Sequence, residues 1–336
     1  MSANWFQNIT GFREGNYEHT RSQLTVDGDE LISKVDGSRH GIGELSLPTL
    51  AELRDRVNVP RTKPITVRPV VGDARAMHAD PELEGALFQV ASQFNLLEMT
   101  GPRITPEHGV TRYADDPTQG PACAIAAGAA TIYRNYFAPV GDQTGQTRDR
   151  QLDALAEVGR ALSAKLGLPV DELWSMQNGY ALCTPRGLTA IADVLSDDAE
   201  RDEVRRQLAI GLHRRVQVTD VRQETRRFVS QAFCSALPVS YGGGLPSNWE
   251  AFGRLVLEAT YEATLLAAVE NSQRGDSNVV LLTRVGGGAF GNPGEWIYDA
   301  IVRALTIVEG SGLDVRLVAY SRIGDSSRAI AERFNG

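Results

Sequence analysis

The chain has 336 residues, 42% of them hydrophobic and 23% charged, with a formal net charge of −8. This balance is typical of a globular protein whose core needs no disulfides, and an acidic chain suits a nucleic-acid backbone poorly. Cys123, Cys183 and Cys234 lack paired spacing, so we expect reduced thiols, no metal site and no cofactor. With no signal pattern and no long apolar run, the sequence predicts a cytoplasmic protein without nucleic-acid or membrane partners.

The first third of the chain begins with turns and then changes to strand and helix patterns. Residues 1–60 mix turns with short apolar runs, and we expect an N-terminal extension there, with residues 61–336 forming the main domain. β-Branched and apolar runs predict buried strands at 65–71 and 87–91. Gly-Pro followed by small helix formers predicts a helix within 119–137 that begins near its proline.

The remainder of the chain alternates strands with helices. Residues 141–212 are expected to form a mainly helical insertion, with an amphipathic helix at 149–166, a strand near 179–183 and a helix capped by Thr184. Further predicted elements are strands at 213–221, 228–234, 278–284 and 315–321 and a long helix at 248–270. This alternation predicts an α/β fold with a mixed, mostly parallel sheet covered on both faces.

A glycine-rich loop at 286–291 follows the predicted strand 278–284 and precedes a helix that begins around Glu295. Such a loop lets backbone N–H groups and a helix N-terminus approach phosphate oxygens. Its glycines fit the GxGxxG spacing, but the loop lies near the C-terminus and no βαβ unit follows it, which argues against a nicotinamide-binding site. A glycine-rich turn without a ligand is the alternative.

A second glycine cluster at 242–244 follows the strand predicted at 228–234. Loops that follow parallel strands lie at the same, carboxyl edge of a sheet, which is where ligands bind in such folds. A diphosphate held between glycine-bearing loops is therefore a physical possibility.

The segment 70–95, VVGDARAMHADPELEGALFQVASQFN, resembles the opening of a macrodomain. The resemblance continues through 109–137 and through both glycine-rich loops, and it covers roughly 65–137 and 213–322. Within that superfamily, the run DPTQGPAC at 116–123 is similar to a divergent branch that includes bacterial effector hydrolases, which remove ADP-ribose from arginine.

The resemblance implies a three-layer α/β/α macrodomain with an N-terminal extension and a helical insertion. It also implies a hydrolase that binds ADP-ribose or an ADP-ribosylated protein, and it leaves the oligomeric state open. By this resemblance Asp73 accepts a hydrogen bond from the adenine amino group, Asn95 faces the distal ribose, and Phe290 packs on that ribose or anchors its loop. The other expected ligand-binding residues are Ala74, Ser92, Thr118, Gln119, Gly120, Gly286, Gly287, Gly288, Ala289, Gly291 and Asn292.

The chain departs from the usual macrodomain pattern at 91–95, where common members carry Asn-Ala-Ala-Asn. This departure favours side-chain carboxylates as catalytic groups, and Asp115, Asp116 and Glu98 are the candidates. Breaking an N-glycosidic bond through an oxocarbenium-like transition state needs charge stabilisation and a base for water, and a carboxylate can also hold an arginine guanidinium. A solvent-exposed turn is the alternative reading of Asp-Asp-Pro.

Three other functions are compatible with these patterns. A reader would bind ADP-ribose through the same loops without hydrolysing it. A nicotinamide-dependent oxidoreductase would use the glycine loop for a dinucleotide. A structural module would bind no ADP-ribose at all.

Overall fold

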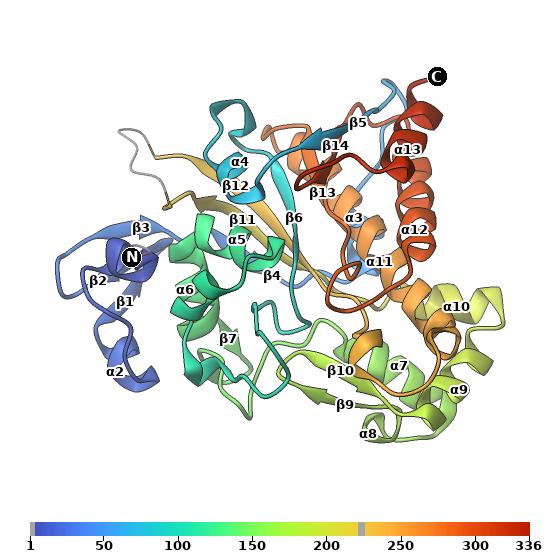
Figure 1. Cartoon of the computed structure of the whole chain (residues 1–336), viewed down its shortest axis with the longest axis horizontal. Coiled ribbons are helices and arrows are strands. Elements are labelled where there is room, and N and C mark those ends of the chain that lie inside the picture. Colours follow the sequence, from blue (N-terminus) through green and yellow to red (C-terminus); the bar gives the residue numbers. More distant parts are fainter. Residues whose placement is uncertain (1–3, 221–225) are drawn as a thin grey trace.

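The computed structural model describes residues 4–220 and 226–336 and is built around one seven-stranded sheet (Figure 1). The strand order is β4 (Glu44–Ser46), β11 (Gly211–Gln217), β12 (Phe228–Cys234), β6 (Leu87–Ala91), β13 (Val279–Leu282), β14 (Asp314–Ala319) and β5 (Thr66–Val71). The β4–β11 and β11–β12 pairs are antiparallel, whereas the other four pairs are parallel. The carboxyl ends of the last five strands therefore lie at one edge.

Helices cover both faces of this sheet. One face carries α3 (Leu50–Arg56), α11 (Pro246–Gln273) and α12 (Gly294–Ile307), and the other carries α4 (Ala74–His78), α5 (Gln119–Ala126) and α6 (Gly128–Tyr136). Within β6 the Gln89 side chain donates to Thr264 of α11 (3.1 Å), whereas the adjacent Phe88 stacks on His78 of α4 (3.8 Å between centroids). Successive strand residues point to opposite faces. The predicted three-layer α/β/α fold with a mixed, mostly parallel sheet is confirmed.

The C-terminal helix α13 (Asp325–Asn335) lies beside α12 along the edge strand β5 (Figure 1). Its Asn335 side chain accepts a hydrogen bond from the Val67 N–H (3.0 Å) and donates one to the Val67 carbonyl (2.6 Å). This amide satisfies backbone groups of an edge strand that would otherwise be left without partners.

The N-terminal segment packs as a small subdomain against α6. It contains α1 (Trp5–Thr10), α2 (Tyr17–Ser22), β1 (Leu24–Asp27), β2 (Glu30–Ser33) and β3 (Arg39–Gly41). A separate apolar cluster joins it to the main body through Ile132 and Tyr136 of α6. The later part of the same segment supplies the edge strand β4 and the helix α3, so the region predicted as an extension also completes the central sheet.

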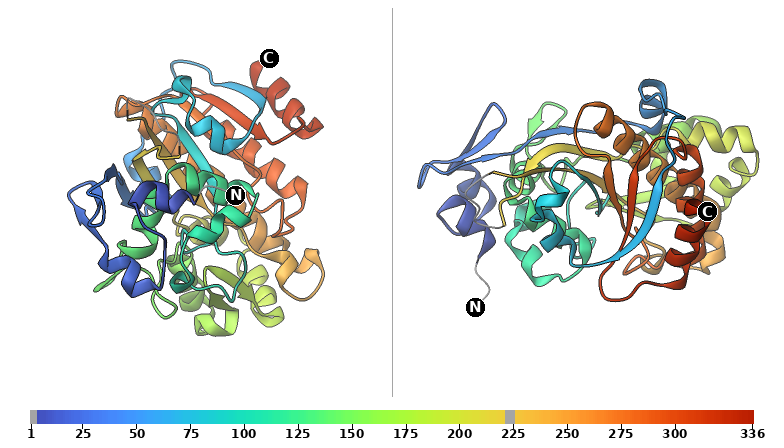
Figure 2. Two further views of the ribbon diagram at one scale, coloured as in Figure 1. Left: turned by 60° about the vertical axis from the view of Figure 1, so that its left-hand side comes forward. Right: turned by 90° about the horizontal axis from the view of Figure 1, so that it is seen from above.

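The segment 141–212 contributes four helices and a hairpin, which pack near the N-terminal half of α11 (Figure 2). After the short pair β7 (Pro139–Val140) and β8 (Gln143–Thr144) come α7 (Ala156–Leu166), α8 (Val170–Leu173), β9 (Trp174–Gln177), β10 (Tyr180–Cys183), α9 (Pro185–Val194) and α10 (Asp198–Arg205). The prediction of a helix from 149 is wrong at its start. The Ala154 backbone instead donates to Phe94 (2.9 Å) and accepts from Ala209 (3.0 Å), which keeps this stretch out of the helix.

The short 3-10 turns lie in the connections, at η1 (Pro81–Leu83), η2 (Pro106–His108), η3 (Thr111–Asp115) and η4 (Val239–Tyr241). Helix α11 begins at Pro246, two residues before the predicted start. Although α11 has 28 residues, no helix within 4–220 and 226–336 is both long and apolar enough to cross a membrane.

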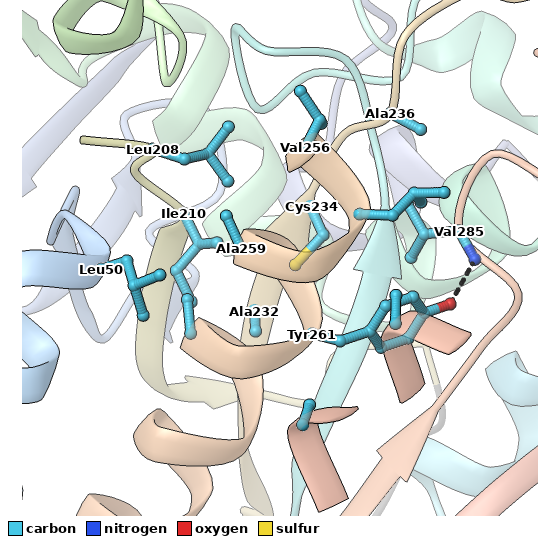
Figure 3. Close-up of a cluster of buried hydrophobic side chains, with 14 of the residues drawn as sticks. Leu50, Leu208, Ile210, Ala232, Cys234, Ala236, Val256, Ala259, Tyr261 and Val285 are labelled. Carbon is cyan, nitrogen blue, oxygen red and sulfur yellow. Dashed lines mark hydrogen bonds between the residues drawn. The ribbon is translucent and has the colours of Figure 1, made fainter. Parts of the chain in front are cut away.

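The core between α11 and the sheet fixes the end of β13. Leu50, Ile210, Val256 and Tyr261 belong to this cluster (Figure 3). The buried Tyr261 hydroxyl donates to the Thr283 carbonyl and accepts from the Val285 N–H (3.0 Å). The Tyr261 hydroxyl therefore fixes the backbone at Thr283 and Val285, directly before the glycine-rich loop begins.

Candidate active site

A cavity of about 880 Å³ lies at the carboxyl edge of the parallel strands. Loops that follow β5, β6, β13 and β14 line it, together with the first turn of α5. Gly120 and Gly288, which are far apart in the sequence, both line this cavity, as expected from the direction of the strands. Its volume is within the range of pockets that hold small organic ligands.

The glycine-rich loop after β13 presents donors to the cavity. Gly286, Gly288, Ala289 and Phe290 line it, and within 4–220 and 226–336 their backbone N–H groups donate to no acceptor. Gly286 has a φ of +74°, a conformation that glycine adopts without the steric cost of a side chain. A cluster of unengaged N–H groups of this kind is suited to phosphate oxygens.

Gly287, Gly291 and Asn292, which were also predicted to bind the ligand, do not line the cavity. The Gly287 N–H closes a turn onto the Arg284 carbonyl (3.1 Å). A Cβ at Gly291 would collide with the Ser240 side chain, so this glycine permits close packing. Asn292 points inward and donates to the Leu237 carbonyl (2.9 Å). These three residues shape the loop.

The first turn of α5 forms the opposite wall. Thr118, Gln119 and Gly120 line the cavity there, and no side chain caps the helix. The Gln119 side chain accepts from the Ala91 N–H (3.0 Å) and donates to the Gln89 carbonyl (3.0 Å), so it ties α5 to β6. The N–H groups of an uncapped first helical turn carry partial positive charge. This wall therefore favours an anionic ligand.

Two of the three carboxyl groups that line the cavity, those of Glu98 and Asp116, influence each other's charge. Glu98 is 3% exposed, and its Oε1 has no hydrogen-bond partner in the described part of the chain. Burial raises the pKa of Glu98 well above its ordinary value, an effect that the Arg134 charge opposes and the Asp116 charge reinforces. Asp116 is half-buried, and its Oδ1 accepts from the Thr118 N–H (2.9 Å). The site thus pairs a buried carboxyl group of raised pKa with a more accessible one.

Asp115 does not join them, which corrects the prediction of three converging carboxylates. It ends η3, whereas Asp116 adopts an extended conformation just after it, so the two side chains diverge. Asp115 is exposed and lies in a separate shallow depression with Glu14 and His108.

Asn95 is also outside the cavity, contrary to its predicted contact with a ribose. It is fully buried, and its side chain donates to Gln151 (2.8 Å) and accepts from the Leu97 N–H (3.1 Å). Its amide thus holds the loop after β6 against the helical insertion. Ser92 does line the cavity, where its hydroxyl donates to the Gln93 carbonyl (3.0 Å).

The other end of the cavity contains Asp73 and Ala74, as predicted. Asp73 is exposed and caps α4 by accepting from the Arg75 N–H (2.8 Å), a contact that occupies one carboxylate oxygen. Tyr320 lies on the adjacent loop and is 78% exposed. An acceptor beside a solvent-exposed ring is suited to a base with an exocyclic amino group.

Aromatic side chains gather where the glycine loop meets the carboxyl groups. Phe290 packs against Tyr180 (5.3 Å between centroids) and Tyr241 (5.8 Å), and all three line the cavity. Phe290 is 8% exposed, so it anchors its loop and also faces the cavity. Both roles considered for this residue are therefore compatible with its position.

Several lining residues were not predicted. Thr283 and Arg284 follow β13, and Arg322 follows β14, so the same strand-end rule that marked the glycine loop could have identified them. The Thr283 hydroxyl is buried without a partner among the described residues. The glycines at 242–244 do not line the cavity, and their loop contributes Tyr241 instead.

The fold and the cavity define an α/β protein with a pocket at the carboxyl edge of its sheet, a place suited to a phosphorylated ligand. No family model matches the sequence, and no curated protein matches it. Similar solved structures include a variant of poly(ADP-ribose) glycohydrolase from Deinococcus radiodurans in complex with ADP-ribose, at 12% identity and a TM-score of 0.46 over 86% of this chain and 92% of that one. Another is the poly(ADP-ribose) glycohydrolase of Thermomonospora curvata bound to the inhibitor ADP-HPD, at 13% identity and a TM-score of 0.46 over 94% and 96%. Identities and TM-scores this low do not show the function of this chain.

Proposed function

We propose that the protein is an ADP-ribosyl hydrolase that removes mono-ADP-ribose from protein side chains, with arginine as the modified residue. The observation that carries this proposal is the convergence, in one cavity, of unengaged loop amides with two carboxyl groups, Glu98 and Asp116. The amides suit a diphosphate, and the carboxyl groups suit the hydrolysis of a glycosidic bond.

The proposed ligand spans the cavity from end to end. The adenine lies near Asp73. The diphosphate accepts hydrogen bonds from the first turn of α5 and from the loop amides that line the cavity, those of Gly286, Gly288, Ala289 and Phe290. The distal ribose then lies beside Phe290, with its C1″ atom facing the two carboxyl groups. The positive ends of the loop and the helix offset the diphosphate charge.

The proposed reaction uses the two carboxyl groups as an acid and a base. The bond between C1″ and the guanidine nitrogen breaks, and the departing guanidine takes the proton of Glu98. The oxygen of a water molecule bonds to C1″, and its proton passes to Asp116. Proton exchange with solvent then resets both groups. Burial raises the pKa of Glu98 well above its ordinary value, which suits its proposed role as the acid.

The choice of arginine rests on the macrodomain branch that the sequence resembles and on the chemistry of the cavity rim, by which we mean Asp116 and Tyr241. A carboxylate such as Asp116 matches the planar donors of a guanidinium. Tyr241 lines the same cavity, is 42% exposed and offers an aromatic face for a delocalised cation. Neither group would favour an ester-linked glutamate or an ether-linked serine in the same way.

The test is incubation of the protein with arginine-, glutamate- and serine-linked ADP-ribosylated proteins, with released ADP-ribose measured by chromatography and mass spectrometry. We expect release from the arginine linkage to be at least about a hundredfold faster than from the other two, because only that leaving group fills the acidic, aromatic rim. Equal release from all three would contradict the choice of arginine. ADP-ribose binding without release from any of them would instead identify a reader.

A further inference from the structure

The loop that carries Glu98 is held both by its own hydrogen bonds and by contacts with other elements. It runs from the end of β6 to η2, and Leu96 within it has a φ of +63°, which a branched side chain adopts only under constraint. The Leu96 carbonyl accepts from the fully buried Arg134 (3.1 Å). Within the loop, the Met99 N–H donates to the Gln93 side chain (2.6 Å), and the Glu98 N–H donates to the Tyr113 hydroxyl of η3 (3.1 Å).

The tip of the β9–β10 hairpin holds the loop on both sides of Glu98. Before Glu98, the Phe94 N–H donates to the Gly179 carbonyl (3.0 Å). After Glu98, the Tyr180 hydroxyl donates to the Met99 carbonyl (2.7 Å), and the Asn178 side chain donates to the Pro102 carbonyl (2.7 Å).

Close backbone approach makes this contact specific to the hairpin tip. Gly179 has a φ of +81°, and a Cβ on it would lie 2.6 Å from the Gln93 Cβ and 2.7 Å from the Asn95 Oδ1. Only a glycine lets the hairpin and the loop lie this close. The Tyr180 ring meanwhile packs on Phe290, so the hairpin contacts both the acid-bearing loop and the glycine-rich loop.

We propose that the β9–β10 hairpin of the helical insertion helps to position the Glu98 carboxyl group for proton transfer, with Tyr180 as its positioning residue. This inference rests on the proposed hydrolase function. It gives the insertion a definite task in the reaction, because the hairpin fixes how deeply Glu98 is buried and where it points. A short displacement of a reacting group lowers the rate far more than it weakens ligand binding.

The ionisable groups around Glu98 come from several elements. They are Arg134 of α6, Tyr113 of η3, Asp116 before α5, Cys123 within α5 and Tyr180 of β10. Tyr180→Phe changes none of their charges at neutral pH, and it removes only the hydroxyl that holds Met99. If the loop relaxes and water reaches Glu98, its pKa falls toward the ordinary value. The pH at which activity declines as Glu98 loses its proton should then move downward.

The experiment compares wild type with Tyr180→Phe and with the matched control Tyr17→Phe. Tyr17 is also a buried tyrosine whose hydroxyl donates to a backbone carbonyl, that of Asn135 (3.1 Å), but it lies outside the cavity. For Tyr180→Phe we expect kcat to fall roughly ten- to a hundredfold, with KM and the ADP-ribose Kd within about twofold of wild type. The alkaline limb of the pH profile should shift to lower pH, and the control should match wild type in every respect.

Hydrogen exchange of the amides in 93–102 provides a readout that does not depend on turnover. We expect faster exchange in this loop for Tyr180→Phe and unchanged exchange for Tyr17→Phe. Unchanged exchange in Tyr180→Phe, or a loss expressed only in KM, would overturn the positioning role. If wild type releases no ADP-ribose although the exchange result holds, the hydrolase proposal fails while the contact between hairpin and loop stands, and proton transfer by Glu98 is rejected.

Discussion

Replacing Asp116 by asparagine is expected to lower the rate of ADP-ribose release by roughly 100- to 10,000-fold while leaving ADP-ribose binding within about threefold of wild type. Asparagine keeps the size of the side chain and an oxygen that can accept from the Thr118 N–H, so the turn before α5 should survive. What it loses is the base that takes the proton from water. Single-turnover release and calorimetric titration with ADP-ribose measure the two quantities separately.

Asp115→Asn is the matched control for this variant. It is the same substitution one residue earlier, but Asp115 is exposed and lies outside the cavity. We expect its turnover to stay within about twofold of wild type, because surface substitutions away from special features have small effects. Equal losses in the two variants would mean that the whole Asp-Asp-Pro turn matters for folding, and the role given to Asp116 would then be wrong.

Replacing Glu98 by glutamine is expected to remove most of the turnover, again by about 100-fold or more, because an amide cannot give up a proton to the departing guanidine. Glutamine has nearly the same shape and can still donate a hydrogen bond in the cavity. Retention of turnover in Glu98→Gln would therefore show that proton transfer is not the role of this residue.

The same variant should be more stable than wild type at neutral pH. Burial raises the pKa of Glu98 above its ordinary value of 4.5, so above that pH the unfolded chain loses a proton that the folded chain retains. Folding stability then falls as pH rises from about 4.5 toward the folded pKa, at about 1.4 kcal/mol for each pH unit. Glutamine carries no such penalty.

Thermal unfolding at two pH values measures this difference. We expect Glu98→Gln to unfold at a higher temperature than wild type at pH 7 and at nearly the same temperature at pH 4, where Glu98 is protonated in both states. A lower unfolding temperature for the variant at pH 7 would mean that Glu98 is ionised and stabilised by Arg134. Such a result would remove the acid from the proposed reaction.

The sheet and its ligand-binding edge could be predicted from the sequence because their signals are local. The apolar run at 279–282 followed by glycines predicts a buried strand and then a loop that can approach a phosphate. Strand direction then places the loops after β13 and β6 at one edge. Gly120 and Gly288 both line the cavity at this edge.

The choice between neighbouring polar residues could not be made in the same way. Asp115 and Asp116 are neighbouring residues of the same type. Helix η3 ends between them, which leaves Asp115 exposed and Asp116 in the cavity. Asn95 matched the expected pattern for a ribose contact, yet its amide is used by Gln151, which is 56 residues further along the chain. Partners so distant leave no local pattern.

Tyr180 illustrates the same limit for the helical insertion. The strand that contains it was predicted near 179–183, but nothing in its alternation indicates that its hydroxyl reaches Met99, 81 residues earlier. In the sequence, Gly179 indicates only a turn before this strand. The close approach that requires a glycine there depends on the loop after β6, which belongs to another part of the fold.

The measurement that tests the central claim most directly is a crystal structure of the protein soaked or grown with ADP-ribose. The account predicts diphosphate oxygens within hydrogen-bond distance of the backbone N–H groups of Gly288 and Gly120, with the distal ribose beside Glu98 and Asp116. Density for ADP-ribose at another surface, or an empty cavity at a concentration that saturates binding in solution, would contradict it.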